Sequence, residues 1–96
     1  MMVLQLYQTS TLTMVSVTPN PSLNDIHVNV QLKDRAFVSI KIMDAGGHEI
    51  LKKKMQASEG LNEFQLEGTG KMKPGNYSLQ VLVNSTESLT VPLIKN

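Results

Sequence analysis

Apolar residues recur at every second position through much of this chain. Between residues 26 and 32 they alternate with His27, Asn29 and Gln31, and the same alternation returns in residues 38–42 and 77–83. Because successive side chains of a β-strand point to opposite faces, this period places the apolar side chains of each segment on one face. The period of an amphipathic helix fits poorly throughout, so the pattern predicts an all-β fold.

Turn signals separate these segments at intervals of roughly ten residues, a spacing typical of β-sandwiches. Burying the apolar face of every strand requires two sheets packed face to face. The sequence therefore predicts a two-layer, immunoglobulin-like β-sandwich of about seven antiparallel strands, without the usual disulfide because cysteine is absent. The expected strands cover residues 11–17, 26–32, 37–44, 49–55, 61–66, 77–83 and 89–93.

Two glycine-containing turns have predictable roles. The glycine pair at 46–47 follows a strand that ends at Asp44, and both glycines can adopt the positive φ that a tight hairpin requires. The Asp44 carboxylate is expected to accept hydrogen bonds from the turn backbone. The Pro-Gly pair at 74–75 predicts a type II turn, after which the ring of Tyr77 is buried and its hydroxyl bonds a partner near the corner.

Two prolines stiffen the chain just before the strand at 26–32. Pro19 and Pro21 fix their own φ angles and push Thr18 and Asn20 toward extended geometry, which excludes helix there. This segment is therefore expected to deliver the chain in extended form to the edge of a sheet.

Length and charge limit the classes of partner. The 96 residues suit one domain, and a formal net charge of +1 without aromatic residues among the basic ones argues against nucleic-acid binding. The run at 52–54 is the basic cluster of the sequence, and its lysines are expected to protect an exposed sheet edge. No apolar stretch approaches the ~20 residues that span a bilayer, and residues 1–15 do not resemble a signal peptide.

Chemically reactive side chains are few and scattered. His27 falls in an expected strand and His48 in an expected hairpin, and neither has a second ligand at metal-binding spacing. Carboxylates occur singly, and no glycine-rich segment joins a strand to a helix, so no cofactor, metal or phosphate site is expected. Asn76 and Asn84 begin glycosylation-type tripeptides but are interpreted as ordinary strand and turn residues. The sequence predicts a protein that is not an enzyme.

Several short segments follow one another in a characteristic order. They are VTPNP at 17–21, VSIKIMDAGGHEIL at 38–51, GLNEFQLE at 60–67, MKPGNYSLQV at 72–81 and a closing LIKN at 93–96. In this order they resemble the C-terminal sorting domain of cargo proteins of the bacterial type IX secretion system. The similarity covers roughly residues 15–96, which leaves residues 1–14 as a linker or N-terminal extension, with 3–7 as either a further strand or an ordered tail.

This resemblance implies a non-catalytic address label at the end of a larger exported protein. In that family the domain follows a cargo protein, is recognised by the outer-membrane translocation machinery and is commonly cleaved by a surface sortase. The whole protein would be transiently periplasmic and then secreted or held at the cell surface. The residues that match the family's motifs are Pro19, Asn20, Pro21, Gly47, Gly75, Tyr77, Leu93, Ile94 and Lys95.

The closing motif is the candidate contact with a receptor. The strand at 88–95 could add its main chain to a receptor sheet, with Leu93 and Ile94 as anchors and Lys95 steering the approach. Alternation makes a core position for Leu93 equally plausible. The chain departs from the family pattern at Pro92, which suggests that the last strand is an edge strand or frays there.

Two other functions stay open at this level. A sandwich of this kind could serve as a spacer or carbohydrate-binding module of a larger extracellular enzyme, and sugar binding would require exposed aromatic side chains. An uncovered edge strand could also pair with a second copy of the chain. The aromatic residues available to a sugar site are Tyr7, Phe37, Phe64 and Tyr77.

Overall fold

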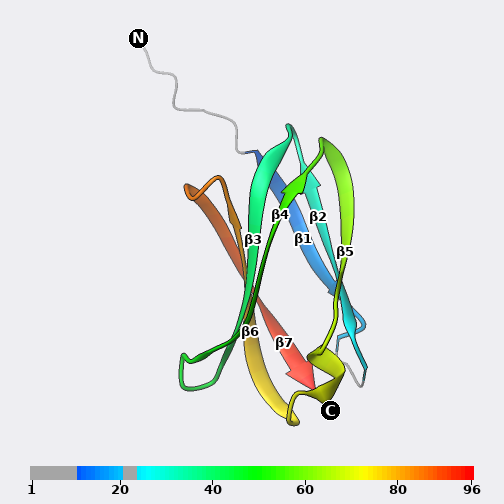
Figure 1. The fold of residues 1–96 in the computed structure, drawn as a ribbon, viewed down its shortest axis with the longest axis vertical. Coiled ribbons are helices and arrows are strands. Elements are labelled where there is room, and N and C mark those ends of the chain that lie inside the picture. Colours follow the sequence, from blue (N-terminus) through cyan, green and yellow to red (C-terminus); the bar gives the residue numbers. More distant parts are fainter. Residues whose placement is uncertain (1–10, 21–23) are drawn as a thin grey trace.

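The computed structural model describes residues 11–20 and 24–96, which fold into two packed antiparallel sheets (Figure 1). Pro21 lies outside the described part, as do residues 1–10 of the extension expected at 1–14, which include the possible strand at 3–7 and Tyr7. The predicted all-β sandwich is confirmed. The strands are β1 (Leu12–Thr18), β2 (Ile26–Leu32), β3 (Ala36–Asp44), β4 (Glu49–Ala57), β5 (Gly60–Leu66), β6 (Gly75–Val83) and β7 (Glu87–Lys95).

The smaller sheet has the order β1-β2-β5 and the larger sheet the order β4-β3-β6-β7. In constant-type immunoglobulin domains the fourth strand joins the sheet of the first, whereas here β4 pairs with β3. The edges of the larger sheet are therefore β4 and β7, and those of the smaller sheet are β1 and β5. The lysine run of residues 52–54 lies on β4, so its predicted position on an edge strand is confirmed.

The core lies between the sheets and is formed by the alternating apolar side chains. On β2, Ile26, Val28 and Val30 are fully buried, while His27 and Asn29 between them are only partly covered. The buried β2 residues face the buried apolar residues of the larger sheet, chiefly Val38, Ile40, Ile42, Leu79, Val81, Val83 and Leu93. At about 25 cal/mol per Å² of apolar area, such burial supplies most of the stabilisation available to a domain without disulfides.

A short 3₁₀ turn, η2 (Thr69–Lys71), was not expected in the glycine-rich loop before β6. The fully buried Thr69 hydroxyl accepts a hydrogen bond from the Ile26 N–H at 3.0 Å and donates one to the Leu66 carbonyl at 2.9 Å. The Asp25 carboxylate accepts from the Gly70 N–H at 2.7 Å, and a Cβ on Gly70 would lie 3.1 Å from the Asp25 nitrogen. The turn thus fixes the loop before β6 against the start of β2.

Candidate functional site

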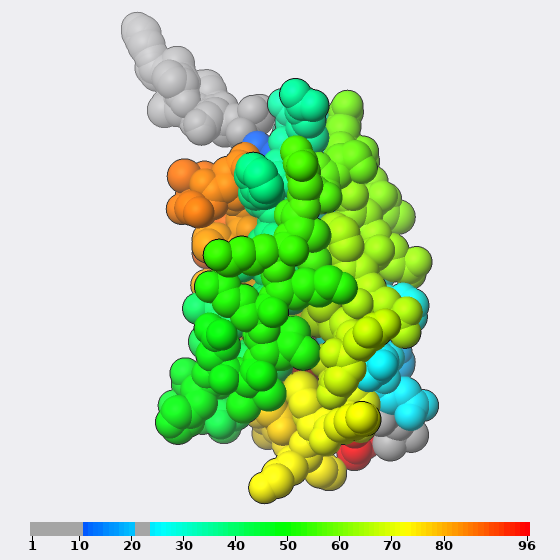
Figure 2. All heavy atoms as spheres, in the orientation of Figure 1, coloured from blue at the N-terminus to red at the C-terminus, as the bar shows by residue number. Residues whose placement is uncertain are grey.

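The described motif residues, though scattered along the sequence, gather at one end of the sandwich. β1 and β3 end there, β6 begins there, and β7 brings the C-terminus to the same end (Figure 1). Cross-strand pairing links Asp44 at the β3–β4 hairpin to Tyr77, and Tyr77 in turn to Leu93. In Figure 2 the C-terminal end reaches the surface beside the segment that precedes β6. We call this region the motif end; β1 starts at the opposite end.

Asn20 joins the opening motif to the closing motif. Its side-chain Nδ2 donates to the Pro92 carbonyl at 2.9 Å, and its Oδ1 accepts from the Ile94 N–H at 3.0 Å. The amide group therefore presents to β7 the donor and acceptor that a neighbouring strand would supply. We call this pair of hydrogen bonds the Asn20 clamp.

Pro92 fits β7 because of the side to which its backbone points. The Pro92 carbonyl faces Asn20 rather than β6, and the N–H and C=O groups of one strand residue point the same way. The N–H that proline lacks would therefore have pointed to the open edge, so the β6–β7 ladder loses no hydrogen bond there. The prediction that the last strand is an edge strand is confirmed.

The side chains of the closing motif lie partly in the core and partly on the surface. Leu93 is 0% exposed, which places its side chain in the core of the folded domain, the alternative that the alternation had left open. Lys95 points to the same side of β7 and is only 6% exposed, with its Nζ donating to the Asn96 carbonyl at 3.2 Å. Its ammonium group is therefore poorly placed to steer a partner. Ile94, on the outer face, is 40% exposed and is the anchor that remains accessible.

Tyr77 forms a corner at the start of β6. Its hydroxyl donates to the Lys73 carbonyl at 2.6 Å, and its half-buried ring packs against the core, as predicted. A tyrosine that bonds the backbone a few residues upstream is typical of immunoglobulin-like folds. The predicted type II turn is wrong: Gly75 begins β6 with φ of 154°, far from the φ of about 80° that such a turn requires.

The β3–β4 hairpin places Gly47 at the motif end. Gly47 has φ of 86° and supplies the positive φ expected of the glycine pair, whereas Gly46 does not adopt a positive φ. The Asp44 carboxylate accepts from the Gly46 and His48 N–H groups, both at 2.9 Å, as expected. The bond from the His48 backbone is the main reason that the pKa of Asp44 lies below its usual value of 3.8.

A second clamp, which the sequence analysis missed, closes the other end of β7. The Glu87 carboxylate accepts from the Leu12 N–H at 2.9 Å and from the Thr11 N–H at 3.1 Å. These bonds lower the pKa of Glu87 below its ordinary value of 4.5, and the bond from the Leu12 N–H has the largest effect. Glu87 and Asn20 together tie β1 to β7 across the open side of the sandwich, where no backbone ladder joins the two sheets.

Each of the two histidines has one carboxylate as a close neighbour. His27 lies 3.7 Å from Glu63 on an exposed sheet face, and His48 lies 3.4 Å from Asp44 in the hairpin. Within residues 11–20 and 24–96, no three His, Cys, Asp or Glu side chains gather as metal ligands would. In the same residues no helix is long and apolar enough to cross a bilayer.

The arrangement is that of an immunoglobulin-like sandwich whose described motif residues gather at the end opposite the start of β1. A family model described as the Secretion system C-terminal sorting domain matches residues 16–96. The chain therefore belongs to the family of type IX secretion C-terminal sorting domains. Members generally act as sorting signals rather than catalysts, and such a tail implies an exported protein that is secreted or displayed on the cell surface. No curated protein matches the chain.

Proposed function

We propose that this domain is a non-catalytic signal that directs a cargo protein attached before it across the outer membrane, and that a surface sortase then removes it. The observation that carries the proposal is the separation of the two ends. The chain enters β1 at one end, and the described motif residues lie at the other (Figure 1). A cargo domain that precedes β1 would leave the motif end accessible to the translocation machinery.

Within the motif end, we propose the outer edge of β7 as the contact with the machinery. Ser88 and Thr90 are exposed on that edge, and the apolar side chain of Ile94 stands beside them. A receptor strand could pair with the main chain between the two clamps. Longer pairing, toward the C-terminus, would require the Asn20 clamp to open.

The test is a reporter fusion. Residues 11–96 are placed behind a fluorescent protein that carries an export signal, in a host with a working type IX system. Sorting predicts extracellular fluorescence, and cleavage predicts a secreted reporter whose mass lacks the domain. Retention in the periplasm of a domain shown to be folded by circular dichroism would refute the sorting proposal. Secretion at full mass would refute cleavage alone.

Self-association through β4 or β7 is the competing proposal for these edges. Both are edge strands of the larger sheet, and unpaired strand edges are templates for pairing with another chain. Sedimentation velocity at two concentrations distinguishes the two proposals. A sedimentation coefficient that rises with concentration would favour pairing between copies over a free edge that awaits a receptor.

A further inference from the structure

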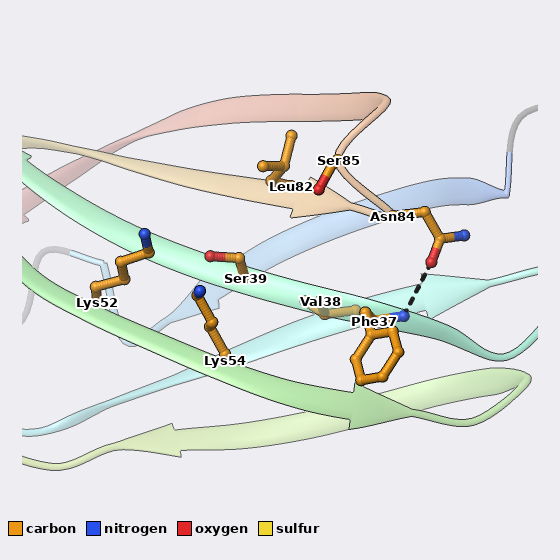
Figure 3. A pocket seen from close by; sticks show the side chains of 8 residues that line it. All are labelled: Phe37, Val38, Ser39, Lys52, Lys54, Leu82, Asn84 and Ser85. Carbon is orange, nitrogen blue, oxygen red and sulfur yellow. Dashed lines mark hydrogen bonds between the residues drawn. The ribbon is translucent and has the colours of Figure 1, made fainter.

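The outer face of the larger sheet carries a pocket of about 500 Å³ away from the motif end. It lies over β3 between β4 and the β6–β7 turn (Figure 3). In Figure 3 the amino groups of Lys52 and Lys54 point toward β3, where Ser39 lies beside Lys54. Leu82 lies on the other side of β3, and the Phe37 ring lies at one end of the pocket. The pocket is open to solvent, and each of these side chains except Leu82 and Ser39 is exposed.

Positive charge on this face is concentrated and uncompensated. Lys41 lies directly opposite Lys52 in the β3–β4 register, and Lys54 lies opposite Ser39 on the same face. Like charges in directly opposed positions destabilise a sheet. In the described part of the chain no lysine lies within 4.0 Å of an Asp or Glu side-chain carboxylate, since both side-chain ion pairs there involve histidine. The fold alone gives no reason to place three lysines at neighbouring positions on this face.

The neighbours of these lysines suit a peptide rather than a bare anion. The Phe37 side chain is 67% exposed, the most exposed of the large apolar side chains in the described residues, and Leu82 lies across the pocket from the lysines. The Asn84 side chain accepts a hydrogen bond from the Phe37 N–H at 3.1 Å, which holds the start of β3 against the β6–β7 turn. An apolar platform beside ammonium groups matches an extended segment that presents acidic and apolar side chains on the same face.

We propose that this face binds an extended acidic segment of a partner protein. Carboxylates of the segment would pair with Lys52, Lys54 and Lys41, and an apolar side chain would rest on Phe37. Because the segment has both charge and apolar surface, it would be preferred over inorganic phosphate and over sulfated polysaccharide. The inference does not depend on the sorting role, since the pocket lies outside the motif end.

The test measures binding of a fluorescein-labelled peptide, ELEELE, to purified residues 11–96 by fluorescence anisotropy at low salt. The triple variant K41E/K52E/K54E is expected to bind at least about tenfold more weakly, because three surface ion pairs are replaced by repulsion. The matched control K33E/K71E/K73E has the same net charge, with its changes at exposed positions outside the pocket, and is expected to retain affinity. Binding should also weaken as salt rises.

A second variant separates the apolar contribution from charge. Phe37→Ser is expected to weaken ELEELE binding by about threefold to tenfold through loss of the apolar contact, while the circular dichroism spectrum stays unchanged. Equal losses in the two triple variants would overturn the proposal, because binding would then follow net charge alone. Binding of heparin or inorganic phosphate without binding of ELEELE would overturn it as well.

Discussion

The Asn20 clamp offers a direct test of how the opening and closing motifs depend on one another. Asn20→Ala removes both hydrogen bonds, at 2.9 Å to the Pro92 carbonyl and 3.0 Å from the Ile94 N–H. At a net 0.5–1.5 kcal/mol for each hydrogen bond, and with the site exposed, the variant should lose about 1–2 kcal/mol of unfolding free energy. For a domain of this size, that loss lowers Tm by about 4–16 °C.

The assay pairs thermal unfolding with hydrogen exchange. Circular dichroism melts give Tm, and exchange of the Ile94 amide, which donates to Asn20, reports the clamp itself. Asn24→Ala is the matched control, since it removes an exposed asparagine from the same β1–β2 connection. The wild-type chain and the control should show the same Tm and the same protection at Ile94.

Two measurements together would show that the Asn20 side chain does not hold β7. If Asn20→Ala has the same Tm as the Asn24→Ala control and its Ile94 amide remains protected from exchange, the Asn20 side chain does not hold β7 in solution. The two motifs would then be independent, and the proposed opening of the clamp by a receptor would lose its basis.

Three further perturbations test other contacts. Because its pKa is lowered, the Glu87 carboxylate stabilises the fold above pH 4.5 and this contribution is lost as pH falls through the folded-state pKa. Glu87→Gln should therefore lower Tm at neutral pH. The difference in Tm between the variant and the wild-type chain should disappear when thermal unfolding is measured at acidic pH. Tyr77→Phe removes the bond to the Lys73 carbonyl and should cost about 0.5–1.5 kcal/mol in urea unfolding, with unchanged spectra. A chain of residues 16–96 lacks the buried Leu12 and should be at least about 2 kcal/mol less stable than residues 11–96; equal urea midpoints would contradict the core role of Leu12.

The prediction about chain length bears on where the domain begins. The family model starts at residue 16, yet β1 begins at Leu12, whose side chain is buried and whose N–H meets Glu87. We therefore propose residue 11 as the start of the folding unit, within the segment that the sequence assigned to a linker. Reporter fusions that begin at residue 16 are expected to sort less efficiently because the domain is less stable.

The sequence determined the strands because their signal is local. Alternation follows from the opposite directions of successive side chains, so the strands from β2 to β7 could be placed within a few residues of their observed bounds. The Asp44 hairpin and the Tyr77 hydroxyl bond were also predictable, since each partner lies within a few residues. Glycine conformation was predicted less well, because glycine permits several backbone regions and a neighbouring proline does not select one.

Tertiary structure decided what depends on distant partners. Strict alternation puts Leu12 and Val17 on opposite faces, yet both are buried because a bulge after Leu12 shifts the β1 register. The partners in the Asn20 and Glu87 clamps are at least 72 residues apart, so no local pattern could pair them. The choice of β3 as the partner of β4, and the burial of Leu93, likewise depend on how the sheets pack. Local geometry sets which residues share a face, and only long-range packing sets which face becomes the core.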